Sequence, residues 1–356
     1  MLIYLFVDAL ILLFGFLTYK KTRKTWAVVL SLLLLVILAA IRGAFTSDYS
    51  NYLAYFLKVR RQVTLSEIFN PAVSFSMEKA FVLLCKLIGF LSDSPIVFFG
   101  IVSLLTLLAY WRGFLEFSPM PMLSILLFVS VGDYYAGYNL TRQILAAALV
   151  FFALTFWNKK QYLPFFVFLL VATSFHRTAL ILFPLVFLLN LRICKKNFFL
   201  LCACGALAGF ALPYFVTLVQ TLFPIYNDYS YGFHAGTINA VIPQLGMLFF
   251  VWLSIALGKC NFDVNERTNR ILINCCILAT ILLFIGLRIY ITSRLAYYFK
   301  AAFCVLIPRV VASYKSEQDR RFVLLCIAFF AVAYTWVSLS GTGYDPYYTL
   351  FADPLR

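Results

Sequence analysis

Arginines at the ends of long apolar segments are the residues of this sequence whose chemistry is most specific. They are Arg42, Arg142, Arg177, Arg288 and Arg294. A guanidinium presents a planar fork of N–H donors that matches the oxygens of a phosphate. Arg142 also lies at the predicted start of a helix, where the partial positive charge of the helix end disfavours a cation unless an anion is bound. We therefore predict a binding site for a polyanion, and a lipid pyrophosphate that bears sugars is the natural candidate.

A histidine accompanies these arginines. The chain has two histidines, and His176 lies between two apolar segments in the stretch TSFHRTALILFP, residues 173–184. An imidazole at the membrane surface can accept a proton from a substrate hydroxyl near neutral pH. Asp48 in FTSDYS and Glu78 in FSMEKAF are alternative catalytic groups. A structural interpretation stays open, in which His176 caps a helix and bonds a backbone carbonyl.

Tyrosines stand beside two of the arginines and predict contacts with sugar rings. The predicted saccharide-binding residues are Tyr49, Tyr52, Tyr297 and Tyr298. An aromatic belt at the membrane interface explains the same residues. For Arg42 a second interpretation also remains, in which its side chain reaches the interface and pairs with Asp48.

The sequence lacks the patterns that hold metals or nucleotides. It has no histidine pair at helical spacing, no DxD carboxylate pair, no Walker loop and no GxSxG motif. We therefore predict no metal site and no cofactor.

The elements that must position these residues are membrane helices. Of the 356 residues, 63% are hydrophobic and 12% are charged, whereas a soluble domain has about 25% charged residues. Long apolar runs recur throughout, which predicts an all-α polytopic membrane protein of about 12–13 hydrophobic helices in a single membrane domain, residues 1–356. The predicted spans are 2–19, 25–41, 76–91, 95–111, 119–138, 142–157, 161–175, 178–191, 198–219, 241–258, 271–287, 295–311 and 322–339.

Clusters of basic residues between the spans predict the orientation. The clusters are Lys20–Lys24, Lys159–Lys160, Arg192–Lys196, Lys259–Arg270 and Arg309–Arg321. Cytoplasmic loops are rich in lysine and arginine, so we place all five clusters in the cytoplasm and do not read the net charge of +15 as a sign of nucleic-acid binding. Alternation then places the N-terminus, the loops 42–75 and 220–240, the tail 340–356 and the ends with Arg142, His176 and Arg288 on the outer side.

This alternation meets one conflict. Spans 76–91 and 95–111 would return the chain to the outside near Arg112, yet Arg142 must also be outside. The apolar core of 119–138 is short, and such segments are often re-entrant or interfacial. We favour a re-entrant segment 119–138, and the alternative is that span 76–91 or 95–111 does not cross fully.

The order of these motifs resembles the EpsG family, which belongs with the Wzy-type polymerases of bacterial exopolysaccharide, capsule and O-antigen. The motifs are R-x5-D-Y-x2-Y from Arg42, a glutamate that opens a span (Glu78), TRQ-x3-A with Arg142, FHRTAL with His176, and SRLAYYF with Arg294 followed by LIP. The similarity covers about residues 1–350. The glycine usual before the Asp-Tyr pair of the family is absent here, because the stretch reads FTSDY.

The resemblance implies a metal-independent glycosyltransferase of the GT-C type in the bacterial plasma membrane. Such a polymerase joins repeat units carried on undecaprenyl pyrophosphate, on the periplasmic or extracellular side, and a chain-length regulator is an expected partner. A flippase for lipid-linked oligosaccharides and a glycan ligase remain alternatives, and so does a membrane acyltransferase with His176 as its base.

Overall fold

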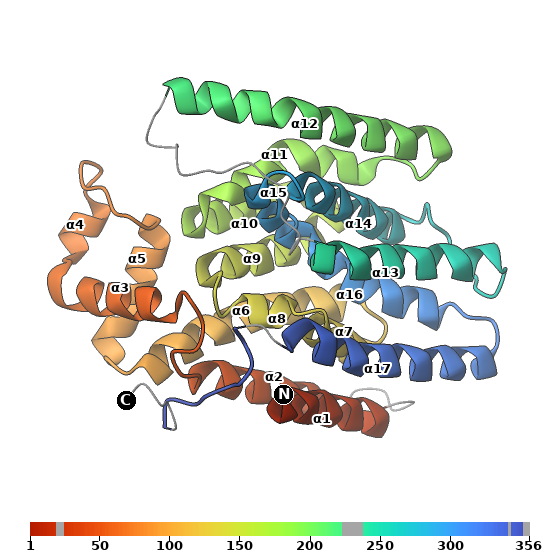
Figure 1. Cartoon of the computed structure of the whole chain (residues 1–356), viewed down its shortest axis with the longest axis horizontal. Helices are drawn as coiled ribbons and strands as arrows, with labels where there is room; N and C mark the ends of the chain where they lie inside the picture. Colours follow the sequence, from red (N-terminus) through yellow and green to blue (C-terminus); the bar gives the residue numbers. More distant parts are fainter. Residues whose placement is uncertain (19–24, 223–237, 341–342, 352–356) are drawn as a thin grey trace. The chain divides into compact units, whose positions relative to one another are not determined.

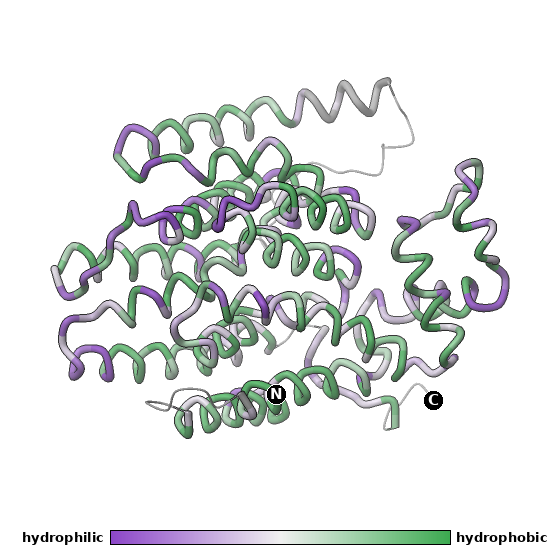
Figure 2. Tube along the Cα trace, turned by 180° about the vertical axis from the view of Figure 1, so that it is seen from behind, coloured by the Kyte–Doolittle hydropathy of each residue, from purple (hydrophilic) through white to green (hydrophobic). Residues whose placement is uncertain are grey.

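The computed structural model describes residues 1–18, 25–222, 238–340 and 343–351. In this part of the chain every regular element is a helix, which confirms the predicted all-α polytopic fold (Figure 1). Five helices are long and apolar enough to cross a membrane, and several shorter apolar helices accompany them. Figure 2 shows apolar residues along the helices and polar residues mainly in the connections. The basic residues of 20–24 and most of the predicted loop 220–240 lie outside the described residues.

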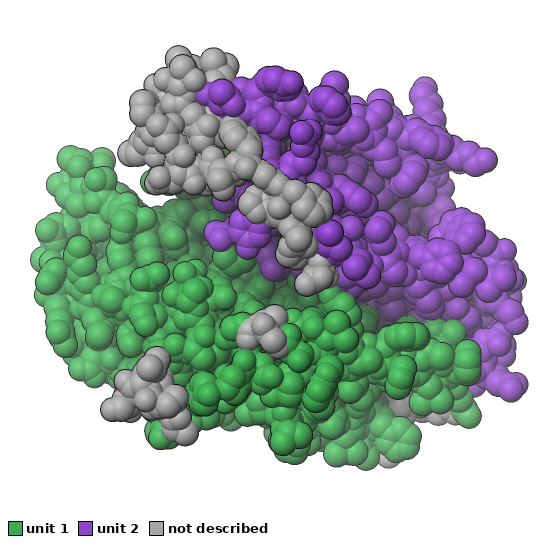
Figure 3. All heavy atoms as spheres, in the orientation of Figure 1, with its two compact units in different colours: residues 1–180, 321–356 green, residues 181–320 purple. Residues whose placement is uncertain are grey.

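The chain divides into two compact units, coloured separately in Figure 3. Unit 1 comprises residues 1–180 and 321–356, and unit 2 comprises residues 181–320. The helices of unit 1 are α1 (Leu2–Thr18), α2 (Thr25–Ala40), α3 (Tyr49–Gln62), α4 (Leu65–Phe69), α5 (Lys79–Leu91), α6 (Pro95–Phe117), α7 (Pro121–Ser130), α8 (Asp133–Ala136), α9 (Thr141–Asn158) and α10 (Tyr162–Phe175). The helices η1 (Arg177–Ile181) and α17 (Glu317–Leu339) cross the boundary between the units.

Unit 2 contains the remaining helices. They are α11 (Leu182–Leu185), η2 (Val186–Asn190), α12 (Lys195–Leu222), α13 (Ile238–Ala256), α14 (Arg267–Gly286), α15 (Tyr290–Leu295) and α16 (Tyr297–Ala312). Most predicted spans therefore correspond to a helix with nearly the same limits. The predicted span 178–191 is instead a succession of short 3-10 and α-helical turns.

The predicted outer loop 42–75 contains the helices α3 and α4. The buried residues of α3 recur at helical spacing, at Tyr49, Tyr52, Phe56 and Val59, so one face of this helix is apolar. Phe56 stacks on Phe98 of α6 at 4.4 Å between ring centroids. Helix α4 begins with a capping box, in which Thr64 and Glu67 bond each other's backbone N–H groups. We call residues 49–91, which contain α3, α4 and α5, the outer lobe (Figure 1).

Helix α5 does not cross the unit, and this resolves the conflict in the predicted orientation. Its first turn lies beside His176, and near its other end the carbonyl of Gly89 accepts a hydrogen bond of 3.1 Å from Nε of Arg60 in α3. One end of α5 is thus held by His176, and the other end is held by Arg60 of α3. The structure therefore supports the alternative of an incomplete crossing by the predicted span 76–91.

The segment 121–136 runs along the length of α1, so the favoured re-entrant interpretation is wrong. A Cβ atom on Gly15, near the end of α1, would lie 3.6 Å from Cβ of Met122. At the other end the ring of Tyr4 lies 5.0 Å from that of Tyr135. The sequence alone does not show this path, because α7 ends at Ser130 and α8 follows only after a glycine turn with positive φ at Gly132.

Helix α6 crosses unit 1 in the direction opposite to 121–136. Near its start, Phe99 lies under Arg42, and near its end, Glu116 pairs with Lys159 at 2.8 Å. Arg112 stands one turn before Glu116 and therefore belongs to the Lys159 end, not to the predicted outer side. We call the opposite end of unit 1, which carries Arg42 and His176, the outer end.

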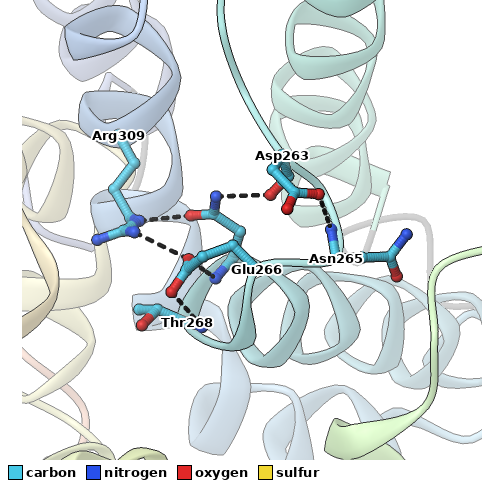
Figure 4. Close-up of polar contacts among 6 residues, drawn as sticks. Asp263, Asn265, Glu266, Thr268 and Arg309 are labelled. Atoms are coloured by element: carbon cyan, nitrogen blue, oxygen red, sulfur yellow. Dashed lines mark hydrogen bonds and ion pairs between the residues drawn. The ribbon is translucent and has the colours of Figure 1, made fainter.

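In unit 2, three of the predicted cytoplasmic clusters meet at one end. Figure 4 shows Glu266 at the start of α14, where its carboxylate accepts from the backbone N–H groups of Thr268 and Asn269. Arg309 of α16 donates to Asn269 at 2.6 Å and to Glu266 at 3.1 Å. Asn265 exchanges hydrogen bonds with the backbone of Ile193. The shared end agrees with the predicted alternation of the spans.

Candidate functional site

A polar cluster at the outer end of unit 1 centres on Glu78. One carboxylate oxygen, Oε2, pairs with Nη1 of Arg142. The other, Oε1, lies 3.2 Å from Nδ1 of His176 and accepts a hydrogen bond of 3.2 Å from the backbone N–H of Arg177. Two predicted catalytic residues and two predicted phosphate ligands therefore come together around one carboxylate. We call Glu78, Arg142, His176 and Arg177 the Glu78 cluster.

Four different elements supply these residues, and each does so at its end, with Arg177 as the first residue of η1. Glu78 is the N-cap of α5, Arg142 lies in the first turn of α9, and His176 is the C-cap of α10. The backbone N–H of His176 donates to Ala172 at 2.9 Å, which closes the last turn of α10. The structural interpretation of His176 as a cap is therefore correct for its backbone, while its imidazole remains available to the Glu78 cluster.

The charges of the Glu78 cluster keep its carboxyl group ionised. Burial alone would raise the pKa of Glu78, but the contact with His176 and the charge of Arg142 outweigh burial and lower the pKa from 4.5 to about 2. The side chain of Glu78 is 11% exposed, against about a fifth for Arg142 and His176. Since Arg177 adds a second, exposed cation, the cluster is net positive even with a neutral imidazole. It can therefore attract an anion.

Tyrosines of α3 support the Glu78 cluster from the side. The hydroxyl of Tyr52 interacts with the guanidinium of Arg142. The hydroxyl of Tyr55, one turn further along α3, lies close to Ser76 and the backbone of Met77, just before Glu78. Tyr55 was not among the predicted site residues. The sequence could have indicated Tyr55, because it lies three residues after Tyr52 and both therefore lie on one side of a helix.

Two of the predicted saccharide-binding tyrosines take part in packing instead. Tyr49 is buried and stacks on Phe99 with ring centroids 4.7 Å apart. Tyr52 is buried with its ring edge against Phe81. Neither ring presents a free face to a sugar, because the predicted loop forms helix α3, which packs against α5 and α6. The predicted sugar contacts of Tyr49 and Tyr52 stay predictions.

Among the described residues, no hydrogen bond or ion pair joins Arg42 or Asp48 to the Glu78 cluster. Arg42 is 2% exposed and follows the last turn of α2, where its Nη1 donates to the carbonyl of Ala39 at 2.7 Å. Asp48 is the N-cap of α3, although its side chain makes no cap hydrogen bond. Among the described residues no ion pair joins Arg42 to an acidic side chain, so the predicted Arg42–Asp48 pair is absent. A catalytic role of Asp48 stays a prediction.

In unit 2 the predicted phosphate ligands flank a helix break. Arg288 lies between α14 and α15, 5.9 Å from the ring centroid of Phe210, and Arg294 lies in α15, 5.2 Å from that of Tyr290. Gly286 permits this break, because a Cβ atom there would come within 2.6 Å of Cβ of Ser293. Discontinuous helices in membrane proteins often line binding sites. The site roles of Arg288 and Arg294 stay predictions.

The structure adds two charged residues inside spans that the sequence analysis missed. Lys300 is buried in α16, with Nζ 4.6 Å from the ring centroid of Tyr297, and Tyr298 beside it is also buried. Asp8 is fully buried in α1, close to Thr335 of α17. Their signal was an ionisable residue within an apolar segment, which is costly and usually functional. The predicted sugar contacts of Tyr297 and Tyr298 stay predictions.

Fold and site together define a multi-pass, all-α membrane protein with a carboxylate, a guanidinium and an imidazole gathered at helix ends. The chain belongs to the EpsG family, whose family model matches residues 25–351. It is therefore a polysaccharide polymerase-like, glycosyltransferase-like membrane protein of polysaccharide biosynthesis. No curated protein and no solved structure matches the chain.

Proposed function

We propose that this protein polymerises lipid-linked oligosaccharide repeat units at the outer face of the bacterial plasma membrane. The donor is a growing glycan on undecaprenyl pyrophosphate, and the acceptor is a hydroxyl of the next lipid-linked unit. The observation that carries the proposal is the Glu78 cluster, because it places a histidine, an ionised carboxylate and cations at one membrane end of an EpsG family chain.

His176 is the proposed base. The carboxylate of Glu78 faces Nδ1 of the imidazole at 3.2 Å, so it favours the tautomer with the proton on Nδ1. The other nitrogen, Nε2, is then free to accept a proton. Glu78 itself is a poor base, since its oxygens already contact Arg142, His176 and the N–H of Arg177 and its pKa is about 2. We therefore assign Glu78 to orienting His176 and stabilising the imidazolium.

The arginines are proposed to hold the pyrophosphate. Arg142 uses Nη1 for Glu78, and its side chain is 20% exposed, so part of the guanidinium remains accessible to a phosphate oxygen. Arg177, which follows His176 in the chain, presents an exposed side chain. Arg142 and Arg177 offset the negative charge that grows on the leaving group. For Arg288 and Arg294 of unit 2, binding of phosphate stays a separate prediction.

The proposed step balances as follows. The acceptor hydroxyl oxygen forms a bond to the anomeric carbon of the donor, and its proton moves to Nε2 of His176. The bond between the anomeric carbon and the phosphate oxygen breaks, and its electron pair leaves with undecaprenyl pyrophosphate. Pyrophosphate is a good leaving group, so the step needs no strong acid. The glycan gains one repeat unit, and no metal takes part in the proposal.

A reconstituted reaction tests this function. Purified protein in lipid vesicles would be given a defined lipid-linked repeat unit, and the products would be separated by length. A ladder of chains with release of undecaprenyl pyrophosphate supports a polymerase. Unchanged substrate on the opposite side of the vesicle would indicate a flippase, and transfer only to a foreign acceptor would indicate a ligase. Either result would refute the proposal.

Variants tie the activity to the Glu78 cluster. We expect Arg142→Ala to abolish polymer while the amount of protein in the membrane stays normal. Arg112→Ala is the matched control, because Arg112 is exposed and belongs to the Lys159 end of unit 1. Polymer of normal length and yield from Arg142→Ala would remove this residue from the site.

A further inference from the structure

Arg42 is a buried cation that no carboxylate among the described residues neutralises. Its side chain is 2% exposed, and no ion pair among the described residues includes it. The guanidinium carbon lies over three aromatic rings, at 4.0 Å from the centroid of Phe99, 4.6 Å from Tyr138 and 6.0 Å from Tyr49. Ring faces stabilise a cation, although they do not satisfy its N–H donors. A buried charge normally has a partner of opposite sign.

The N–H donors of Arg42 are incompletely used. Nη1 donates to the carbonyl of Ala39 at the end of α2, which offsets part of the charge through the helix dipole. Nε is buried and has no partner among the described residues. An unpaired, buried donor of this kind costs free energy comparable to a lost charged hydrogen bond. An acceptor at Nε would remove this cost.

A cavity beside Arg42 offers space for such an acceptor. Its volume is about 30 Å³, and Arg42, Ser103, Gly137, Tyr138 and Thr141 are among its lining residues. A water molecule needs roughly 10–15 Å³ by this measure, so the cavity has room for about two molecules or ions of that size. Thr141 is the first residue of α9, whose N-cap residue Leu140 provides no side-chain oxygen. The positive end of the α9 dipole therefore reaches the same cavity as Arg42.

We propose that this cavity is a binding site for one small monovalent anion, such as chloride. The anion would accept from the guanidinium of Arg42 and face the uncapped start of α9. A neutral water molecule could fill the space, but it would leave the guanidinium and the α9 dipole uncompensated. This assignment replaces the pyrophosphate contact predicted for Arg42, and it holds whether or not the protein is a polymerase.

The C-terminal tail excludes a larger ligand. The N–H of Gly43 donates to Tyr348 at 2.7 Å, and the N–H of Leu350 donates to Ile41 at 2.8 Å, so the tail pairs with the backbone on both sides of Arg42. The hydroxyl of Tyr347 also bonds the carbonyl of Leu38. A pyrophosphate with attached lipid and sugars would have to displace these contacts, whereas a chloride ion is little larger than water.

Thermal stability measures this binding without any substrate. Purified protein would be melted at constant ionic strength while sodium gluconate is replaced stepwise by sodium chloride. We expect the melting temperature to rise by roughly 2–5 °C and to reach a plateau, as a single saturable site requires. Sodium bromide should act as chloride does. A rise without saturation, or no rise, overturns the proposal.

Two variants test whether the chloride-dependent rise in melting temperature comes from the cavity beside Arg42. Arg42→Met keeps an apolar chain against Phe99 and Tyr138 and removes the donors, so it should lose the chloride-dependent rise. Arg112→Met, which removes an exposed arginine at the other end of the unit, should keep it. An equal rise in Arg42→Met would show a general salt effect and overturn the proposal. If Arg42→Met does not fold, bromide soaked into wild-type crystals decides, because anomalous density beside the guanidinium of Arg42 supports the site and its absence overturns it. A rise caused by phosphate but not by chloride would overturn the assignment of the ion.

Discussion

Replacement of Glu78 by glutamine is the sharpest test of the Glu78 cluster. The change keeps the size of the side chain and removes its charge, so Arg142 and His176 both lose their anionic partner. A pKa of about 2 in place of 4.5 corresponds to roughly 3 kcal/mol in favour of the ionised, folded state. Because water still reaches the carboxylate, which is 11% exposed, we expect a loss of about 2 kcal/mol of stability. For a chain of 356 residues that loss corresponds to a fall of roughly 2–4 °C in melting temperature.

The pH dependence of this stability has a definite sign. Folding lowers the pKa of Glu78, so the contribution is complete at neutral pH and disappears as the pH falls from 4.5 toward about 2. Glu78→Gln should therefore differ from wild type in melting temperature at pH 7 and approach it at pH 3. An equal difference at both pH values would mean that the carboxylate acts only through packing.

The activity of Glu78→Gln should fall by roughly 10²–10⁴, because His176 loses the group that orients it and stabilises its protonated form. The assay is the vesicle reaction, with initial rates of polymer formation measured across pH 5–9. Glu116→Gln is the matched control, since Glu116 pairs with Lys159 at 2.8 Å but is 35% exposed and lies at the opposite end. A rate within twofold of wild type for Glu78→Gln, at normal protein level, would refute the proposed orientation of His176.

Three further variants test other parts of the structure. His176→Gln should lower the rate by roughly 10²–10⁴ and leave the melting temperature within 2 °C, and a normal rate would exclude His176 as the base. Arg294→Ala should abolish polymer without loss of protein from the membrane, as judged by immunoblot and chain-length gels. Gly286→Ala should destabilise the protein by about 1–3 kcal/mol, because the new methyl group meets Ser293, and Gly246→Ala is its control because nothing lies within 4 Å of that position. Equal melting temperatures of the two alanine variants would contradict the close approach at the helix break.

The sequence analysis predicted the limits of many spans well, but it did not predict which residues contact one another across the fold. Length and apolar composition are local properties, so the limits of α2, α9 and α10 lie close to the predicted ones. The pairing of Arg142 with Glu78 joins residues 64 positions apart and cannot be read from either motif. The predicted site residues were therefore partly right in identity, while their partners came only from the fold.

Short or interrupted segments gave the errors. Residues 49–62 have charged and aromatic residues on a helix that packs one face only, so they resembled an interfacial loop. Segment 121–136 crosses unit 1 although its helix breaks after Ser130, and no apolar run of full length marks it. The enclosure of Arg42 depends on the tail, whose Tyr347 bonds a carbonyl 309 positions earlier. Contacts of this range leave no periodic signal in the sequence.

The position of α5 outside the set of crossing helices explains how one carboxylate can serve three partners. A glutamate within a spanning helix would be held at a fixed depth and would lose its charge to desolvation. Glu78 instead caps a helix that packs on the outer lobe, so it reaches the first turn of α9 and the last turn of α10 while keeping contact with water. The hydroxyl of Tyr55 lies close to Ser76 and Met77, in the segment just before Glu78. The outer lobe thus acts as the scaffold that brings a charged group to the ends of two membrane helices, and loosening it through Tyr55→Phe should weaken polymer formation while the spans themselves stay intact.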